Sequence, residues 1–183
     1  TLINGYNSNK ILDVIKLDEE YFLNENITVS GNFALGIFTY DQADGAYNKN
    51  GVYSIKLYVD NEIYYSFQVD ELNFNTTRFI NAHIDYCEKI ENQIKFHRCH
   101  KLPHNKLKNY NYLKNNGIIK FNDSLVHKIR IEVSDIFGNI SKLNFDIKST
   151  PQPFANKCLM NKDSLSSNIL SKKYFNYNTP NFF

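Results

Sequence analysis

Residues 51–69 alternate between hydrophobic and polar side chains with a period of two, as half-buried β-strands do. We predict a hairpin whose loop has three residues, 60–62, because this register makes one continuous apolar face. A slip of one residue would bury the polar set instead. The predicted cross-strand pairs are Val59–Ile63, Leu57–Tyr65, Ile55–Phe67 and Tyr53–Val69.

A second alternating stretch, residues 126–147, predicts another hairpin. Gly138-Asn139 supplies a turn that can adopt positive φ. An isolated hairpin is marginally stable in water, so each apolar face needs a second layer. We therefore expect the two hairpins to stack face to face, each covering the other. The apolar positions of the second hairpin are Ile129, Ile131, Val133, Leu143, Phe145 and Ile147.

The remaining patterns predict a strand pair from Ile27 onward and a helix from about Thr76 to Glu91 with Asn75 as its cap. Residues 1–26 are predicted to be a linker or edge strand, and residues 150–183 an extended C-terminal segment. These elements favour an all-β fold: an immunoglobulin-like antiparallel β-sandwich with a long, partly helical insertion.

The β-sandwich domain is expected to cover residues 27–149, with the insertion at 71–117. The insertion is much longer than most connections inside a compact domain, which indicates a functional segment or a small cap.

The composition favours β-strands and limits the kinds of partner that the chain is expected to bind. The chain of 183 residues contains 13 Tyr and 14 Phe but no Trp. A formal net charge of +2 is too small to indicate a general nucleic-acid or membrane-surface role. No apolar run is long enough to predict a transmembrane segment, and the polar first residues show no signal peptide. The missing initiator Met suggests a mature form or an excised piece.

The cysteines and histidines of the insertion suggest a zinc site. The candidates are His97, Cys99, His100 and His104, because His and Cys are the usual ligands of tetrahedral zinc. Their spacing matches no pair-plus-pair pattern, and Pro103 argues against a helix that would bring two of them together. We favour a solvated basic loop.

The three cysteines, Cys87, Cys99 and Cys158, leave at least one unpaired. The sequence allows a Cys87–Cys99 disulfide, and we favour ordinary thiols.

An acidic loop offers oxygen ligands for calcium. Asp41 and Asp44, with Asn48 and Asp60, are the candidates, since Ca²⁺ needs several oxygens at once. Asp and Asn are also common turn residues, and the spacing is not that of an EF-hand.

Two further groups are candidates for interaction with a partner. Lys95, Arg98 and Lys101 lie near tyrosines and could bind an anionic polymer. Tyr58 and Tyr64 could stack on sugar rings, although we favour their covering another part of the protein. The chain contains neither a Gly-x-Ser-x-Gly elbow nor a glycine-rich phosphate loop, so we predict no catalytic residue in it.

Several longer strings also resemble a known family. They are GIFTYDQADGAYNKNGVYSIKLYVDNE, DELNFNTTRFINAHIDY, RCHKLPHNKL, and NNGIIKFND with HKIRIEVSDIFGNIS. They resemble a β-rich region of Bacteroidetes-type proteins that carry a LytM/lysostaphin-type zinc metallopeptidase domain upstream of it. The resemblance covers about Gly31 to Lys148.

The resemblance implies an interior, non-catalytic piece of such a protein. The family's zinc site uses a His-x-x-x-Asp pair and a His-x-His, and this chain has neither, since His83 is followed four residues later by Cys87. Zinc is therefore expected only in the upstream peptidase domain, and no cofactor in this stretch.

The implied function is an accessory domain that positions a murein endopeptidase or docks it to partners. The implied location is the periplasm or outer-membrane/cell surface of a Gram-negative bacterium. The expected partners are its own upstream peptidase domain and envelope proteins, with peptidoglycan or surface glycan as a further candidate, but no nucleic acid. Two alternatives stay open: a carbohydrate-binding module, and a structural subunit of an envelope complex.

Overall fold

The fold is taken from a computed structural model, which describes residues 2–5, 10–42, 47, 49–151 and 174–176. These residues are mostly in strands, as predicted for an all-β protein. The first strands are β1 (Leu2–Ile3), β2 (Ile11–Leu17), β3 (Glu20–Leu23), β4 (Ile27–Phe33), β5 (Gly36–Phe38), β6 (Ser54–Val59) and β7 (Glu62–Gln68). The later ones are β8 (Phe96–Arg98), β9 (Tyr110–Leu113), β10 (Ile119–Phe121), β11 (Val126–Ser134), β12 (Ile140–Ser149) and β13 (Tyr174–Asn176). Helical segments are α1 (Phe74–Thr77), α2 (Ile80–His83), α3 (Tyr86–Glu91) and the 3₁₀ turn η1 (Asn115–Gly117).

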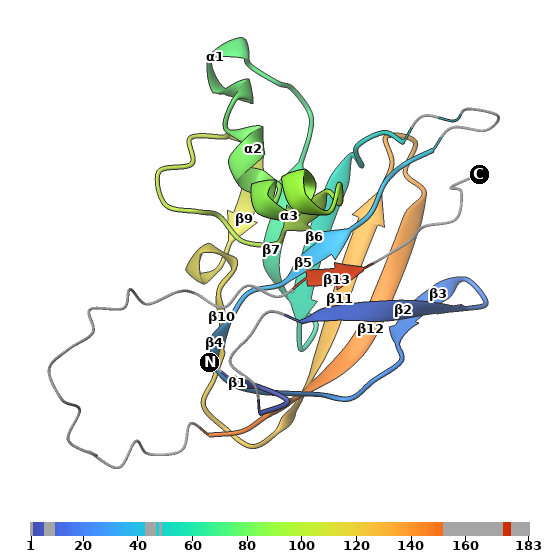
Figure 1. Ribbon diagram of the computed structural model, residues 1–183, viewed down its shortest axis with the longest axis vertical. Coiled ribbons are helices and arrows are strands. Elements are labelled where there is room, and N and C mark those ends of the chain that lie inside the picture. Colours follow the sequence, from blue (N-terminus) through green and yellow to red (C-terminus); the bar gives the residue numbers. More distant parts are fainter. Residues whose placement is uncertain (1, 6–9, 43–46, 48, 152–173, 177–183) are drawn as a thin grey trace, which may run out of the picture.

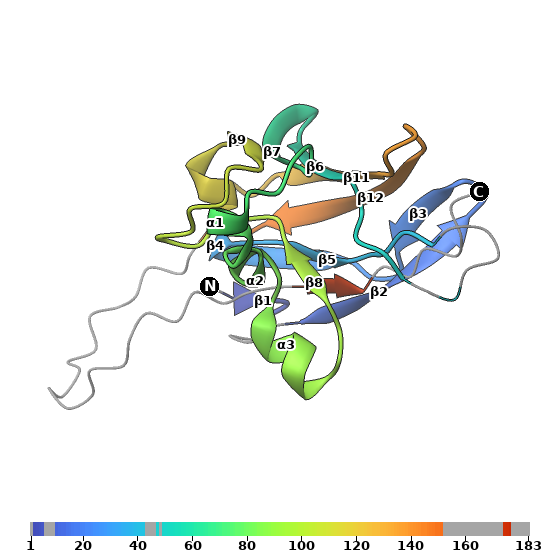
Figure 2. The same ribbon diagram turned by 90° about the horizontal axis from the view of Figure 1, so that it is seen from above.

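The strands form one open sheet that curls over itself (Figure 1). Its order is β8-β5-β13-β2-β3-β12-β11-β6-β7-β9, and β4 joins β12 to β1 and β10. Seen from above, β12, β11, β6 and β7 form one layer, and β4, β5 and β8 lie across from them (Figure 2). In the part of the chain that the structure describes, no helix is long and apolar enough to cross a membrane.

The first predicted hairpin forms, but its turn differs from the prediction. Ile55 pairs with Phe67 and Leu57 with Tyr65, as expected. Beyond Leu57 the register shifts, so that Val59 pairs with Glu62 and the loop contains only residues 60 and 61. Both loop residues have positive φ, at 51° and 67°, as the central residues of a type I′ turn do. The predicted three-residue loop is therefore wrong. A β-bulge after Leu57, rather than a longer loop, allows Ile55 to pair with Phe67 and Leu57 with Tyr65.

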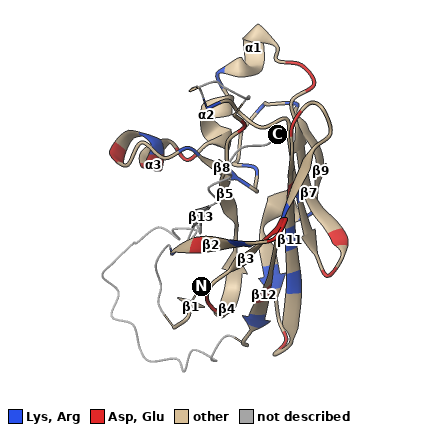
Figure 3. Cartoon of the chain, turned by 90° about the vertical axis from the view of Figure 1, so that its right-hand side faces the viewer, with Lys and Arg blue, Asp and Glu red and all other residues tan. Residues whose placement is uncertain are grey.

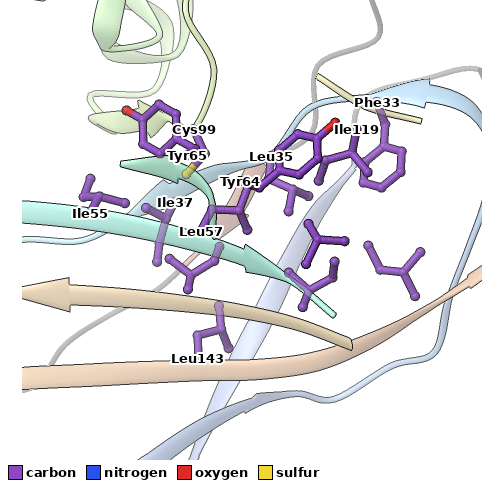
Figure 4. Close-up of a cluster of buried hydrophobic side chains, with 14 of the residues drawn as sticks. Phe33, Leu35, Ile37, Ile55, Leu57, Tyr64, Tyr65, Cys99, Ile119 and Leu143 are labelled. Atoms are coloured by element: carbon purple, nitrogen blue, oxygen red, sulfur yellow. The ribbon is translucent and has the colours of Figure 1, made fainter. Parts of the chain in front are cut away.

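The second predicted hairpin also forms, with Ile129 opposite Phe145 and Ile131 opposite Leu143, but the two hairpins do not stack face to face. β11 pairs with β6 edge to edge, with Ile131 opposite Leu57, so both hairpins belong to one layer. This arrangement pairs two strand edges whose backbone groups would otherwise be exposed. The apolar face of the layer is covered instead by the β4–β5 segment, including Leu35 and Ile37 (Figure 4).

The N-terminal residues are part of the sheet. β2 and β3 form a hairpin, and β3 runs parallel to β12. Leu12 and Tyr21 are buried in the core. Of the predicted extended C-terminal segment, only β13 and the residues up to Pro151 are described, and β13 pairs in parallel with β2 and β5.

The single helix predicted for residues 76–91 is three short helices. The first begins after Asn73, whose side chain accepts the backbone N–H of Asn75, so the predicted cap residue lies inside the helix. The path breaks at Ile84, which is extended and forms a β-bridge with His97 of β8. Asp85 then caps α3. Pairing with a strand therefore overrides the helical periodicity at this point.

The predicted insertion is built into the sheet at both of its ends. β8 pairs with β5, and β9 pairs with β7. Residues 71–117 thus supply both terminal strands of the main strand order as well as the three helices.

His127 on β11 connects two turns through its ring nitrogens. Nδ1 lies 2.7 Å from the Asp60 carboxylate and Nε2 lies 3.0 Å from that of Asp123, while the ring stacks on Phe121. A neutral imidazole can donate from only one nitrogen, so two carboxylates favour the charged form. Burial opposes this, but the hydrogen bonds to both aspartates outweigh it and raise the pKa of His127.

The backbone at Gly117 lies very close to Cys99 and His100, the two residues that follow β8. It has a φ of +79°, and a Cβ there would lie 2.3 Å from the carbonyl oxygen of Cys99 and 2.6 Å from Cα of His100. We expect Gly117→Ala to lower the free energy of unfolding by about 1–3 kcal/mol, from backbone strain and this clash. Urea denaturation measures the effect.

The control is Gly51→Ala, where a Cβ meets nothing within 4 Å and φ is not in the left-handed region. It should leave the denaturation midpoint almost unchanged. Equal midpoints for the two variants would show that the close approach at Gly117 relaxes without cost.

Candidate functional site

The predicted basic loop is in fact a buried polar cluster. Cys99 is 0% exposed, and Arg98 and His100 are each 4% exposed. The solvated loop is therefore wrong for these residues, because β8 pairs with β5, Arg98 is bonded to the helical segment, and Gly117 lies against Cys99 and His100. His97, on the same strand, is half-buried.

Arg98 ties the helices to the sheet. Its Nη1 donates to the carbonyl oxygens of Ala82 and Ile84, at 3.1 and 2.7 Å. Its Nη2 lies 3.0 Å from Oδ2 of Asp85, and both side chains of this ion pair are buried. Oδ1 of Asp85 accepts the backbone N–H of Cys87 at the start of α3. Arg98 thus holds the junction of α2 and α3 and is unavailable to an external anion.

Beside this ion pair, two histidines contact each other. Nε2 of His83 lies 3.2 Å from Nδ1 of His97, and the His83 ring stacks on Phe67 at a centroid distance of 3.9 Å. Burial lowers the pKa of His83 well below its ordinary range, and the neighbouring His97 and Arg98 add to this. Burial, together with the charge of Lys95, lowers the pKa of His97 to about 4. Both rings are therefore neutral at pH 7.

A chain of hydrogen bonds determines which nitrogen of each ring carries the proton. The backbone N–H of Leu107 donates to Oδ1 of Asn105 at 2.9 Å, so the Asn105 amide nitrogen faces the Tyr110 hydroxyl at 3.1 Å and donates to it. The Tyr110 proton then points to Nδ1 of His83, 3.5 Å away. His83 consequently carries its own proton on Nε2 and donates it to Nδ1 of His97. That leaves His97 protonated on Nε2.

His97 also lines a pocket of about 360 Å³. Phe38 and Tyr40 come from β5 and the residues after it, and Lys95 precedes β8. Lys49 comes from the loop that the Asp41–Asn50 bridge closes, and its Nζ lies 4.2 Å from the centre of the Tyr40 ring. The pocket therefore combines aromatic rings, two ammonium groups and one imidazole, which is a lining suited to binding.

The zinc candidates do not converge. His97 faces His83 and the pocket, Cys99 is in the core, and His100 and His104 line a second, more open pocket with Lys101. Within the described ranges no three His, Cys, Asp or Glu side chains are placed to share a metal ion. Burial raises the pKa of Cys99 to about 12, so its thiol stays protonated. Cys87 is exposed and, like Cys99, free, so the two form no disulfide.

The calcium candidates are separated or not described. Asp41 forms the backbone bridge to Asn50, whereas Asp44 and Asn48 lie outside the described residues. Asp60 is at the β6–β7 turn, where it contacts His127. The structure therefore does not place Asp60 with Asp41.

The remaining interaction candidates have different environments. Lys95 is exposed beside the first pocket, and Lys101 lies 5.2 Å from the centre of the Tyr110 ring. Tyr58 is half-buried under the guanidinium of Arg130, at 4.4 Å. Tyr64 is 6% exposed; its hydroxyl donates to the carbonyl of Ile118 and accepts from the side-chain amide of Asn115 in the insertion.

These positions do not form the continuous basic surface that an anionic polymer needs. Figure 3 shows Lys and Arg spread along β11 and β12, and residues of both charges on α3.

Sequence reasoning missed several residues of the site. No pattern in the sequence connected His83 or Lys49 with His97 as parts of one pocket. The proximity of these residues to His97 depends on strand pairing between distant segments. A useful signal was available in His83, since a histidine on the apolar side of a helix needs a buried hydrogen-bond partner.

Comparison with known proteins found no matching family model, no matching curated protein and no matching solved structure.

Proposed function

We propose that this chain is a non-catalytic binding domain of a cell-envelope protein that resembles the LytM/lysostaphin-type murein endopeptidases. It would position the enzyme or dock it to partners in the periplasm or at the surface of a Gram-negative bacterium. The partners would be the upstream peptidase domain and envelope proteins. As to the fold, we propose that the curled sheet is a variant of the immunoglobulin-like sandwich, since its two ends face each other across one core.

The pocket beside His97 is the observation that carries this proposal. Its lining comes from β5, β8 and a bridged loop, so a ligand there would meet side chains held by paired strands. The titratable groups nearby are engaged in holding the fold: Arg98 with Asp85, and His83 with His97. Side chains that are already engaged in holding the fold are better suited to forming a rigid binding pocket than to taking part in a catalytic reaction.

A carbohydrate-binding module is the second candidate. The aromatic residues Phe38 and Tyr40 line the same pocket, and rings of this kind can stack on the faces of sugars. This candidate places the glycan at Phe38 and Tyr40, rather than at Tyr58 and Tyr64.

Co-sedimentation with insoluble murein separates these functions. Retention that soluble muropeptides displace supports the carbohydrate-binding module. Absence of retention, together with binding of the separately purified peptidase domain, supports the docking role. Solubilisation of cell walls by the purified chain in a chelator-sensitive manner would contradict a non-catalytic domain.

A further inference from the structure

The protonation pattern of the buried chain determines what His97 offers to the pocket. Nδ1 of His97 accepts from His83, so the proton of His97 is on Nε2. No hydrogen bond of that nitrogen to a described residue is observed, and it is not one of the buried side-chain atoms left without a partner, so it is accessible. Since His97 lines the pocket, Nε2–H is a donor available there.

The orientation of this donor is imposed from the far end of the chain. The Asn105 amide is oriented by a backbone N–H, which has a proton to give and cannot accept one. Because the hydroxyl of Tyr110 accepts from Asn105, its own proton is directed to Nδ1 of His83, and His83 then donates from Nε2 to His97. In the reverse direction the Tyr110 oxygen would accept from both Asn105 and His83, and no described residue is placed to accept the hydroxyl proton of Tyr110. The pocket is thus built to meet an acceptor.

Two cations add a charge preference to this donor. Lys49 and Lys95 line the same pocket, whereas the Asp and Glu side chains of the described chain do not. Lys49 is held against the Tyr40 ring, which restricts where its ammonium can lie. Phe38 and Ile84 supply apolar surface that suits a carbon skeleton better than a free inorganic ion.

We propose that the pocket binds a carboxylate group of a small organic ligand, with His97 Nε2–H and the ammonium groups of Lys49 and Lys95 as its donors. This rests on the binding role proposed above for the same pocket and adds the ligand class. The carboxylate could come from an acidic sugar or from the end of a peptide, and both would present the same oxygens.

Calorimetric titration of the full chain with three probes tests this. N-acetylmuramic acid carries a carboxylate on a sugar, N-acetylglucosamine is a matched sugar without it, and N-acetylalanine has a carboxylate without a sugar. We expect the muramic acid to bind at least about tenfold more tightly than N-acetylglucosamine, a difference of about 1.4 kcal/mol. Tighter binding of N-acetylalanine instead would identify a peptide end as the source, and it also supports a carboxylate site.

Variants locate the site. Lys49→Gln and Lys95→Gln alter exposed side chains, and each should weaken the acid about threefold or more with no change in the melting temperature. Lys106→Gln, exposed and outside the pocket, is the matched control and should bind as the wild type does. His97→Phe should weaken binding while His97→Gln, which keeps an N–H donor, should retain part of it. The Nε2–H resonance of His97 should also shift when the acid is added.

Equal affinity for the acid and for N-acetylglucosamine would overturn the proposal, as would equal competition by inorganic phosphate or no binding at millimolar concentration. Failure of the murein experiment together with carboxylate binding would reject the glycan-binding role and leave this inference standing. Murein retention that is unchanged by Lys49→Gln and Lys95→Gln would support the glycan-binding role and reject the carboxylate site in this pocket.

Discussion

Arg98→Ala is expected to lower the free energy of unfolding by about 3–5 kcal/mol. The substitution leaves the Asp85 carboxylate buried without its cation, because both side chains of the pair are inside the protein. It also removes the donor to the carbonyl oxygens of Ala82 and Ile84 at the junction of α2 and α3. Urea denaturation at pH 7.5 measures the loss.

Lys114→Ala is the matched control. Lys114 also forms an ion pair, 3.1 Å from Glu62, but both side chains are exposed, so the denaturation midpoint should hardly change. The double variant Asp85→Ala/Arg98→Ala completes a thermodynamic cycle. We expect it to lose less than the sum of the single variants, since neither leaves an isolated buried charge once the other is absent. Strict additivity would mean that the two groups do not interact.

The alternation of residues predicted many of the inward-facing positions, although Tyr64 and Ser66 on the opposite face of β7 are buried as well. Ile55, Leu57 and Ile131 were all assigned to the apolar face, and all are 0% exposed. Alternation states which side of a strand is buried but carries no information on what lies opposite. The covering layer is β4–β5, and the choice of β6 and β11 as sheet neighbours depends on backbone pairing, to which every residue type contributes alike.

The candidate site was predicted only in part, for a related reason. Lys95 and His97 were both singled out from the sequence, and the structure places both at the pocket. Arg98 was taken as exposed because it is charged and lies among lysines, yet Asp85 thirteen residues earlier neutralises it in the interior. An ion pair between a strand and the break between two helices leaves no periodic pattern in the sequence. The charge of Arg98 was therefore taken as a sign of an exposed side chain.

Acidification from pH 6.5 to pH 4 is expected to destabilise the fold through the buried histidine pair. Both rings are neutral in the folded state, whereas in the unfolded chain each takes up a proton near pH 6.5. Their contribution to stability is therefore fully present above pH 6.5 and is lost as the pH falls toward the lowered folded values. For His97, whose pKa falls from 6.5 to about 4, the loss is about 3 kcal/mol.

His127 changes stability in the opposite direction. Its pKa is raised by Asp60 and Asp123, so its stabilising effect is complete below pH 6.5 and is lost as the pH rises through the folded value. The lowered pKa values of Asp123 and Asp135 act at still lower pH, because their contributions are full above about pH 4. Between pH 6.5 and about 5, the decline on acidification is therefore assigned to His83 and His97, before the aspartates begin to protonate.

Urea denaturation at pH 7.5, 6.5, 5.5 and 4.5 tests this for the wild type and two variants. His97→Gln removes one titrating ring and should flatten the decline between pH 6.5 and 4.5, although it lowers stability at pH 7.5. His127→Gln should keep the decline, since its own contribution does not diminish on acidification. A wild-type stability that is the same at pH 7.5 and 4.5 would show that the two rings take up protons as readily in the folded protein as in the unfolded chain, which contradicts the lowered pKa values of the pair.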